Sequence, residues 1–320
     1  MAEKTNHFIL LDEKYSGECS GSIIYGPKED EILHDLETAM KYLKTLKTAD
    51  DGSLNEVNAL EINPVTKAGV LTAVLHKVSG EKKQYPWQVL GVDPPDKIRT
   101  SFTVSIDNPD STLECIKATT YPIIKLKMGS EYDDDIIRVM KQIPSKKFRV
   151  DANGGWDPEK AERMVHKLSR LNVEIIEQPT GVEYIGEWPH IKGSNNACLM
   201  VDEGLYTVTD YERYCDFVDG INIKMAKSGG VVEAIKIAQR ARKDGRKVMF
   251  GCMVESSVAI AQSVYLASLA DFFDLDGPLL IKQDMADGLI YKNESINVDE
   301  NIIGGPKLKK EFIREHEIES

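Results

Sequence analysis

The sequence contains no apolar run that approaches the ~20 residues needed to cross a bilayer, and it has no long run of basic residues. Its 52 acidic residues outnumber the 40 lysines and arginines, which gives a net charge of −12. Binding to nucleic acid or to an anionic membrane surface needs a positive patch. We therefore expect neither a nucleic acid nor a membrane among the partners of this protein.

Cysteine is also scarce and scattered. There are five cysteines, an odd number, and none forms a CxxC pair or a Cys/His cluster. Structural zinc sites and disulfide frameworks need such closely spaced or paired residues. The first residues, 1–7, are polar and lack the apolar centre of a secretion signal. These features predict a reduced, cytoplasmic protein without structural zinc.

The 320 residues are 42% hydrophobic and 29% charged, as in an ordinary globular protein, and they suffice for one large domain or two. The chain changes character near residues 93–96. Before that point, two short strand-like runs, 8–11 and 22–25, precede helical patterns that start at Pro27 and Pro64. This pattern predicts an α+β segment over residues 1–97.

After that point, strand-like runs alternate with helical stretches, and each repeat takes about 25 residues. Such alternation predicts a parallel sheet with helical crossovers. No GxGxxG fingerprint follows the first strand, so a closed TIM-type barrel over residues 98–285 is favoured over a doubly wound sheet. Residues 286–320 contain no further repeat and either pack against the N-terminal part or trail from the barrel. The predicted strands are 101–106, 123–128, 148–152, 173–177, 198–202, 220–225, 247–252 and 272–275.

Ionisable residues interrupt these apolar runs at their carboxyl ends, which is where barrel enzymes build active sites. Three of them, Asp151, Glu177 and Asp202, end consecutive predicted strands. Because neighbouring strands lie ~4.8 Å apart, the three carboxylates can converge on one hard cation, and oxygen ligands suit Mg²⁺. Lys127 ends the strand before this row and Lys224 ends the strand after it. A single strand-end carboxylate is more often a helix cap or salt-bridge partner, but three at this spacing between two lysines favour a metal site.

This combination of residues resembles the enolase superfamily, and within it the muconate-lactonising-enzyme subgroup. The resemblance rests on Lys125-x-Lys127, Asp151-x-Asn153, Glu177-Gln-Pro, Asp202-Glu203 and Lys224, and more weakly on Gly17-Glu-Cys-Ser20. It implies a (β/α)7β barrel over residues 98–285 and an α+β capping domain over residues 1–97, with 286–320 as a candidate to complete that domain. It also implies one Mg²⁺ per subunit, held by Asp151, Glu177 and Asp202.

In such enzymes a metal stabilises an enediolate while lysines move the proton. The resemblance therefore implies that Lys127 and Lys224 are the acid/base pair on opposite faces of a substrate α-carbon, which gives two-base 1,1-proton transfer. Lys125 is expected to contact the substrate carboxylate or to help lower the pKa of Lys127. Asn153 and Asn222 share strand faces with Asp151 and Lys224, and they are expected to support the metal site from behind.

A further pair, Asp274 and Asp276, shares one face of the last predicted strand. This Asp-x-Asp resembles the dipeptide epimerase branch, in which the pair holds the substrate's α-ammonium group. The segment with Cys252 and Met253 also resembles that branch, so both are candidate substrate contacts. Thr103 is either a substrate contact or a buried strand threonine. The implied substrate is a dipeptide of the L-Ala-Glu type from cell-wall turnover.

Two other interpretations stay open. One is another enzyme of the subgroup, namely a cycloisomerase, an o-succinylbenzoate synthase or an N-acylamino-acid racemase. The other is a non-catalytic relative that kept the fold. In the family, the capping domain opens with a strand and a mobile loop before the run that resembles residues 8–11, and no such residues precede it here. We therefore expect a less complete lid. The family is often oligomeric, which leaves a homo-oligomer open.

Overall fold

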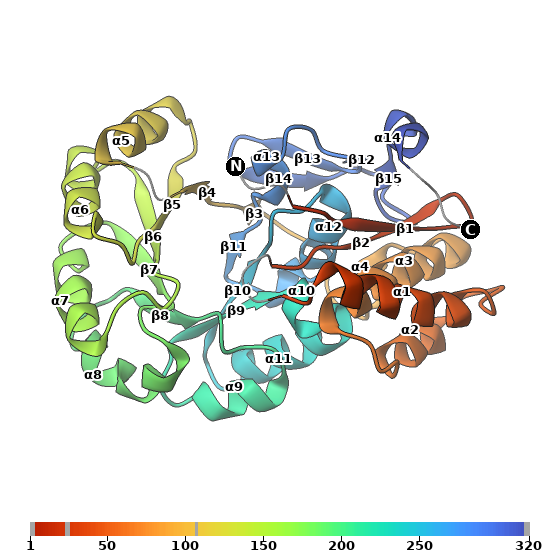
Figure 1. Ribbon diagram of the computed structural model, residues 1–320, viewed down its shortest axis with the longest axis horizontal. Coiled ribbons are helices and arrows are strands. Elements are labelled where there is room, and N and C mark those ends of the chain that lie inside the picture. Colours follow the sequence, from red (N-terminus) through yellow and green to blue (C-terminus); the bar gives the residue numbers. More distant parts are fainter. Residues whose placement is uncertain (1–3, 23–25, 106–107, 317–320) are drawn as a thin grey trace.

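The structure is a computed structural model that describes residues 4–22, 26–105 and 108–316. Within these residues, its larger part is an eight-stranded parallel sheet in which each strand pairs with the next along the chain (Figure 1). The sheet closes because Thr100 bridges Phe273, and the Ser101 amide donates to the Phe273 carbonyl at 3.3 Å. The strands are β4 (Phe102–Val104), β5 (Ile123–Lys127), β6 (Lys147–Asp151), β7 (Val173–Glu177), β8 (Cys198–Val201), β9 (Gly220–Lys224), β10 (Lys247–Gly251) and β11 (Phe272–Asp274).

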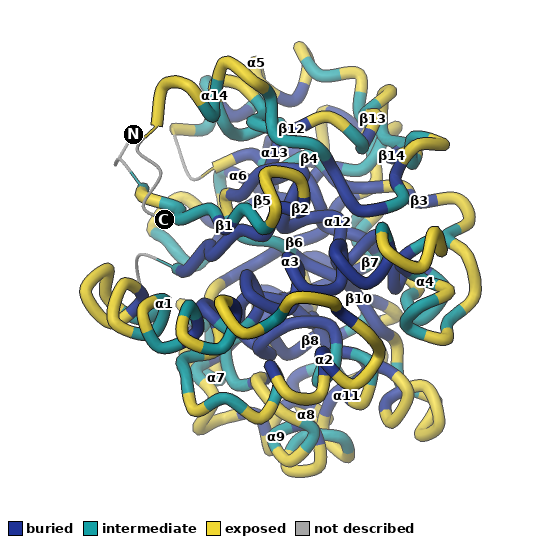
Figure 2. Tube along the Cα trace, turned by 90° about the vertical axis from the view of Figure 1, so that its right-hand side faces the viewer, coloured by how far each residue is buried: buried dark blue, intermediate teal, exposed yellow. Residues whose placement is uncertain are grey.

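Helices cover the outside of this barrel, since each parallel strand needs a crossover before the next. In Figure 2 the strands run through the buried interior, and the connecting helices turn exposed faces to solvent. The helices are α5 (Pro109–Ala118), α6 (Asp133–Gln142), α7 (Pro158–Leu168), η1 (Val182–Glu187), α8 (Trp188–Lys192), α9 (Val208–Tyr214), α10 (Met225–Ser228), α11 (Val231–Lys243), α12 (Ser257–Tyr265) and η2 (Ala267–Leu269). The predicted barrel is confirmed, and each of its eight predicted strands overlaps an observed one.

The strand register brings the polar strand ends together. Lys127 pairs with Asp151 across β5 and β6, and Asp151 pairs with Glu177 across β6 and β7. Glu177 pairs with Met200 of β8, so Asp202 follows directly after that strand. Because all these strands are parallel, the four side chains gather at the carboxyl-terminal edge of the barrel.

The N-terminal part is a small α+β unit beside the barrel (Figure 1). Strand β1 (His7–Leu11) pairs antiparallel with β2 (Tyr15–Cys19). The helices are α1 (Glu29–Leu43), α2 (Asp51–Asn58), α3 (Pro64–Lys82) and α4 (Pro86–Val89). Helix α3 begins at the predicted proline, with Asn63 accepting from the Thr66 amide at 2.9 Å as its N-cap. Most of α3 is buried because it packs between β2 and the barrel.

Strand β2 was not predicted, although all five of its residues are buried. Its sequence, YSGEC, has no aliphatic residue. Its contact with α3 is made by two glycines, Gly17 of the strand and Gly69 of the helix, rather than by large apolar side chains. A Cβ at Gly17 would lie 2.1 Å from the Gly69 carbonyl oxygen, so strand and helix touch backbone to backbone. The run predicted at 22–25 lies outside the described residues except for Ser22, which belongs to no strand.

The C-terminal segment turns back toward the N-terminal part, as Figure 1 shows for β15 beside β2. The Ser16 hydroxyl donates to the Pro306 carbonyl at 2.9 Å, and the Ser16 carbonyl meets the His76 ring at 2.6 Å. Gly305 lies directly on that ring at φ 78°. The elements are α13 (Gly277–Leu280), β12 (Ala286–Asp287), β13 (Leu289–Lys292), β14 (Ser295–Val298), β15 (Lys307–Leu308) and α14 (Lys310–Glu315); β14 also pairs with β3 (Ile98–Arg99).

Among the described residues, no helix is both long enough and apolar enough to pass through a membrane.

Candidate active site

Three carboxylates stand in a row at the carboxyl-terminal edge of the barrel. Asp151 ends β6, Glu177 ends β7, and Asp202 follows β8. All three are buried, with at most 1% of each residue exposed to solvent. Three neighbouring buried carboxylates repel one another and lose hydration, so positive groups must lie among them.

Lys125 supplies the central positive charge. Its Nζ lies 3.0 Å from Asp151 Oδ2, 2.8 Å from Glu177 Oε2 and 2.7 Å from Asp274 Oδ2. Burial alone would lower the pKa of Lys125, but the charges of Asp151, Asp274 and Glu177 outweigh it and raise that pKa well above its usual value. Lys125 is thus a permanent cation that joins β5 to β6, β7 and β11.

The carboxylates respond differently to this setting. Burial favours the protonated form of Asp151, but Lys125 and Lys127 outweigh it, so the pKa of Asp151 is lowered. Burial, followed by repulsion from Asp151, raises the pKa of Glu177 to about 7. Of the three carboxylates, Glu177 is therefore the one whose negative charge is least compensated, and additional positive charge would stabilise its ionised form.

Lys127 and Lys224 lie at the two ends of the row. Lys127 Nζ lies 2.7 Å from Asp151 Oδ2 and 3.0 Å from Asn153 Oδ1, and 27% of its side chain is exposed at the barrel mouth. Lys224 Nζ lies 2.7 Å from Asp202 Oδ2 and is almost fully buried. The two predicted acid/base lysines therefore contact different carboxylates, two strands apart.

A fourth lysine, Lys227, was not predicted. It lies on α10, one turn beyond Lys224, and its Nζ donates to both the carbonyl oxygen and Oδ1 of Asp202. Burial, only partly opposed by the charge of Asp202, lowers the pKa of Lys227. The sequence signal for this lysine was the spacing Lys224-x-x-Lys227 just before Gly229. Gly229 ends α10 in the left-handed conformation at φ 75°, so the helix is a single turn that follows directly after Lys224.

Amide side chains fix the carboxylates from behind. Asn222 Nδ2 donates to Glu177 Oε1 at 2.7 Å, and Asn153 Nδ2 donates to Glu203 Oε1 at 2.9 Å. Gln178, which was not predicted, accepts from the Asp202 amide at 2.9 Å and from the Glu203 amide at 3.1 Å. Asn222 thus holds Glu177 of the row, whereas the Asn153 side chain contacts Glu203 and Lys127, and only its backbone amide donates to Asp151. That the two asparagines support a metal stays a prediction.

The two aspartates at the end of β11, Asp274 and Asp276, have different environments. Asp274 is held by Lys125 and by the Ser101 hydroxyl at 2.7 Å, and Lys125 keeps its pKa low despite burial. Asp276 accepts from the Thr103 amide at 2.6 Å, and Cys252 Sγ lies 4.0 Å from its other oxygen. Burial, followed by repulsion from Asp274, raises the pKa of Asp276 to about 7. Of this pair, Asp276 is the one without an ion-pair partner among the described residues.

The acidic row has the donor chemistry that a divalent metal ion requires. Asp151, Glu177 and Asp202 offer carboxylate oxygens only, as Mg²⁺ prefers. In the described structure the three do not already form a compact metal-binding group, because lysine ammonium groups lie between them. A carboxylate oxygen has two lone pairs; Asp151 Oδ2 accepts from both Lys125 and Lys127, whereas Oδ1 accepts from the Asn153 amide at 3.0 Å. Glu203 Oε2 is also buried without a hydrogen-bond partner among the described residues, so the site fits a cation.

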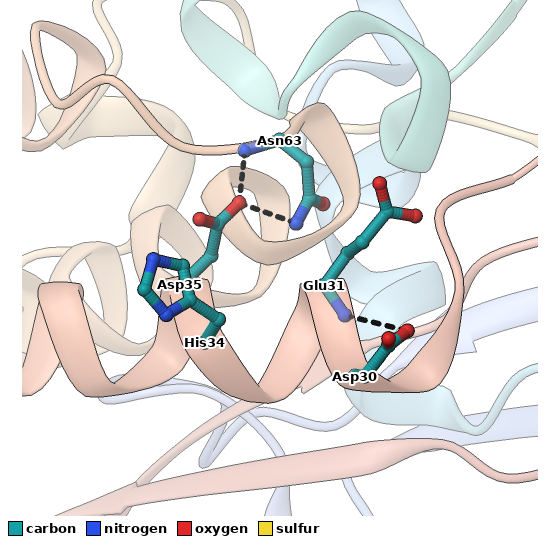
Figure 3. Close-up of a pocket in the computed structure, with 5 residues that line it drawn as sticks. All are labelled: Asp30, Glu31, His34, Asp35 and Asn63. Atoms are coloured by element: carbon teal, nitrogen blue, oxygen red, sulfur yellow. Dashed lines mark hydrogen bonds between the residues drawn. The ribbon is translucent and has the colours of Figure 1, made fainter.

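A hollow of about 380 Å³ lies elsewhere, on α1 of the N-terminal part. Figure 3 shows its acidic side chains and His34 around Asn63. Asp35 Oδ2 accepts from both the backbone and the side-chain amide of Asn63, each at 2.6 Å. Asn63 caps α3, so this cluster has a structural role and is separate from the barrel mouth.

Known proteins are similar to this chain in sequence and in fold. A family model described as "Enolase C-terminal domain-like" matches residues 110–299. The L-Ala-D/L-Glu epimerase of Bacteroides thetaiotaomicron is 30% identical over 278 residues, which are 83% of this chain and 72% of that protein. A hydrophobic dipeptide epimerase from a Flavobacteria bacterium is 35% identical over 248 residues, which are 73% of this chain and 70% of that protein.

A solved structure, a substrate-liganded complex of the L-Ala-D/L-Glu epimerase from Bacillus subtilis, superposes with a TM-score of 0.83 at 26% identity. The superposition covers 94% of this chain and 90% of that one. The resemblance inferred from the strand-end residues is thus confirmed by sequence and by fold. The family match spans more than half of the chain, and the chain belongs to the enolase C-terminal domain-like family.

Proposed function

We propose that the protein is a magnesium-dependent dipeptide epimerase that inverts an α-carbon by proton transfer between two lysines. The observation that supports this most directly is the placement of Lys127 and Lys224 at opposite ends of one carboxylate row. A substrate carboxylate bound at the row would have its α-carbon between the two ammonium groups. Each lysine could then reach one face of that carbon.

The metal ligands would be Asp151, Glu177 and Asp202, with one ion per subunit. Bound Mg²⁺ would supply positive charge where negative charge develops on the substrate carboxylate as the α-proton leaves. One lysine, in its neutral form, takes the α-proton as the C–H bond breaks. The other, as an ammonium, returns a proton to the opposite face. The α-carbon is thereby inverted, and the protons exchange with solvent between turnovers.

The remaining residues hold the substrate. Asp276 is the candidate partner of the substrate's α-ammonium group, because Asp274 is already paired with Lys125. Thr103 fixes Asp276 through its backbone amide, and Cys252 lies beside it. Lys125 would balance the negative charge of Asp151 and Glu177 in the row. A cycloisomerase or o-succinylbenzoate synthase substrate has no ammonium group, which favours a dipeptide.

Residues 1–97 would act as the capping domain, completed by the segment 286–320, whose β15 packs against β2. One link to the barrel is Glu18, which accepts from the Ser256 amide at 3.1 Å and from the Ser256 hydroxyl at 2.5 Å. This contact ties β2 to the loop between β10 and α12, beside the barrel mouth. The less complete lid stays a prediction.

The test is α-proton exchange in D₂O, followed by NMR with a library of L,L-dipeptides that includes L-Ala-L-Glu and hydrophobic dipeptides. We expect deuterium incorporation and epimer formation with Mg²⁺ and neither with EDTA. Lactone formation from muconate, dehydration to o-succinylbenzoate or α-proton exchange of N-acylamino acids, together with no exchange of any dipeptide, would assign another activity of the subgroup. No reaction of any of these compounds would favour the non-catalytic relative.

Variants at the two lysines test the mechanism. Lys127→Ala and Lys224→Ala should each lower the inversion rate by about 10² to 10⁴. Each variant should retain exchange with at most one epimer, and the retained epimer should differ between the two variants. Undiminished inversion by Lys224→Ala would contradict the two-base assignment. Isothermal titration with Mg²⁺ shows independently that these variants still bind the metal.

A further inference from the structure

A cavity of about 120 Å³ lies between the N-terminal part and the barrel mouth. The lining from the N-terminal part includes Pro27, Pro64 and Val65. The barrel contributes Tyr206 from the loop after β8, Ala226 from α10 and Met253 from the loop after β10. These groups are predominantly apolar, so the cavity is suited to a hydrocarbon group.

The cavity adjoins the acidic row through one lysine. The Lys227 side chain lines it, while its ammonium group binds Asp202 and lies 5.7 Å from the centre of the Tyr206 ring. Lys224 binds the other oxygen of the same Asp202 carboxylate. One carboxylate therefore separates the cavity from a lysine proposed to act on the α-carbon, which places the cavity within reach of a side chain on that carbon.

The nearby cations are already committed to protein groups. Lys227 already donates to the carbonyl oxygen and to the carboxylate of Asp202. Lys4, on the N-terminal side, donates to Ser20 Oγ at 2.7 Å and to the Val254 carbonyl at 2.9 Å. The negative charges of Glu255 and Glu18 attract its ammonium group. A carboxylate entering the cavity would lose its hydration without gaining a free cationic partner from these residues.

We infer that this cavity receives the side chain of the residue being inverted, and that it selects an aliphatic side chain over a carboxylate-bearing one. The inference rests on the proposed function and narrows its substrates to hydrophobic dipeptides. Each methylene buried there should raise kcat/KM about fourfold, until the cavity is filled. A carboxylate buried there without a cationic partner should lower kcat/KM by a larger factor.

The experiment measures kcat/KM for epimerisation of L-Ala-L-Ala, L-Ala-L-Val, L-Ala-L-Met and L-Ala-L-Glu by the full chain with Mg²⁺. Methionine and glutamate side chains have similar length, so their ratio reports charge rather than size. We expect L-Ala-L-Met to exceed L-Ala-L-Glu by at least about tenfold, and L-Ala-L-Val to exceed L-Ala-L-Ala. Equal or better turnover of L-Ala-L-Glu would overturn the inference and leave the proposed function standing.

A variant pair links the preference to the cavity. Met253→Lys places an ammonium group in the lining, and it should shift the Met-to-Glu ratio toward glutamate by at least about tenfold. Met253→Leu keeps the lining apolar and should leave the ratio unchanged. An unchanged ratio in Met253→Lys, with activity on L-Ala-L-Ala retained, would show that the side chain binds elsewhere. No turnover of any dipeptide would overturn the inference together with the proposed function.

Discussion

The ammonium group of Lys125 lies 2.7 Å from the carboxylate of Asp274, across 149 positions of the chain, and both side chains are buried. The contact links the second strand of the barrel to the last one. Since Lys125 also contacts Asp151 and Glu177, one cation compensates three buried carboxylates. Removing Lys125 would leave buried carboxylates without this cation. Breaking a buried ion pair in this way costs far more stability than replacing both partners by apolar residues.

Lys125→Met should therefore lower the free energy of unfolding by about 3 to 5 kcal/mol. Lys127→Met is the matched control, because Lys127 is partly exposed and contacts only one of these carboxylates. It should destabilise much less while still abolishing inversion. Urea unfolding followed by circular dichroism, with EDTA and again with Mg²⁺, measures both variants. Equal stability of Lys125→Met and Lys127→Met would show that Lys125 is not the central cation of the site.

The same contact separates the roles of Asp274, which ends β11, and Asp276. Asp276→Asn should raise KM for a dipeptide by about 10- to 100-fold, since it removes the charge proposed to bind the α-ammonium group. It should affect the N-acetylated form of the same dipeptide much less. Asp287→Asn, at an exposed position, is the control and should change neither constant. Equal losses with the free and the acetylated dipeptide would assign Asp276 a structural role.

Much of this site could be predicted because it follows the strand periodicity. Asp151, Glu177, Asp202 and Lys224 each end an apolar run, and parallel strands bring such ends to one edge. The partners of Lys125 could not be predicted, because its contact with Asp274 depends on barrel closure across the whole domain. Which carboxylate oxygen contacts which lysine also depends on side-chain geometry, and the spacing of residues along the sequence does not determine that geometry.

Other features lacked a sequence signal of the usual kind. Lys227 reaches Asp202 only because α10 is a single short turn that places it beside the strand end. Strand β2 has no hydrophobic alternation, since Gly17 lies against Gly69 where a side chain would normally pack. In both cases close backbone packing, rather than hydrophobic pattern, determines the structure.

Glu255 makes stability depend on pH at the junction of the two parts. Burial, followed by repulsion from Glu18 and opposed by Lys4 and more weakly by Lys224, raises the pKa of Glu255 to about 8. The usual value is 4.5, so between pH 4.5 and 8 the folded state binds a proton that the unfolded state has released. This contribution to stability is complete below pH 4.5 and is lost as pH rises toward 8.

Glu255→Gln should therefore become more stable relative to the unchanged protein as pH rises through this window, by up to about 1.4 kcal/mol per pH unit. Urea unfolding at pH 5, 6, 7 and 8 measures the difference. Buried His76 acts in the opposite sense, since its pKa is lowered to about 3, but it is common to both proteins and cancels in the comparison. Parallel stability curves for the two proteins would contradict the shifted pKa of Glu255.

The contact of Gly17 with Gly69 gives a prediction about the strand that carries Glu18. A methyl group at Gly17 would lie 2.1 Å from a backbone oxygen of α3, and no flexible side chain can move aside. Gly17→Ala should therefore cost at least about 1 to 3 kcal/mol of unfolding free energy, because β2 and α3 must separate. Gly186→Ala, where no atom lies within 4 Å, is the matched control and should change stability by less than about 0.5 kcal/mol.

The shift of β2 should also reach the barrel mouth, since the adjacent Glu18 holds Ser256 at the loop after β10. Gly17→Ala should thus lower kcat/KM at temperatures well below its unfolding midpoint, whereas Gly186→Ala should not. Circular dichroism melting and epimerisation assays on the same preparations separate the two effects. If Gly17→Ala lost stability but kept full activity, the packing of β2 would matter for folding alone, and its link to the active site through Glu18 would be wrong.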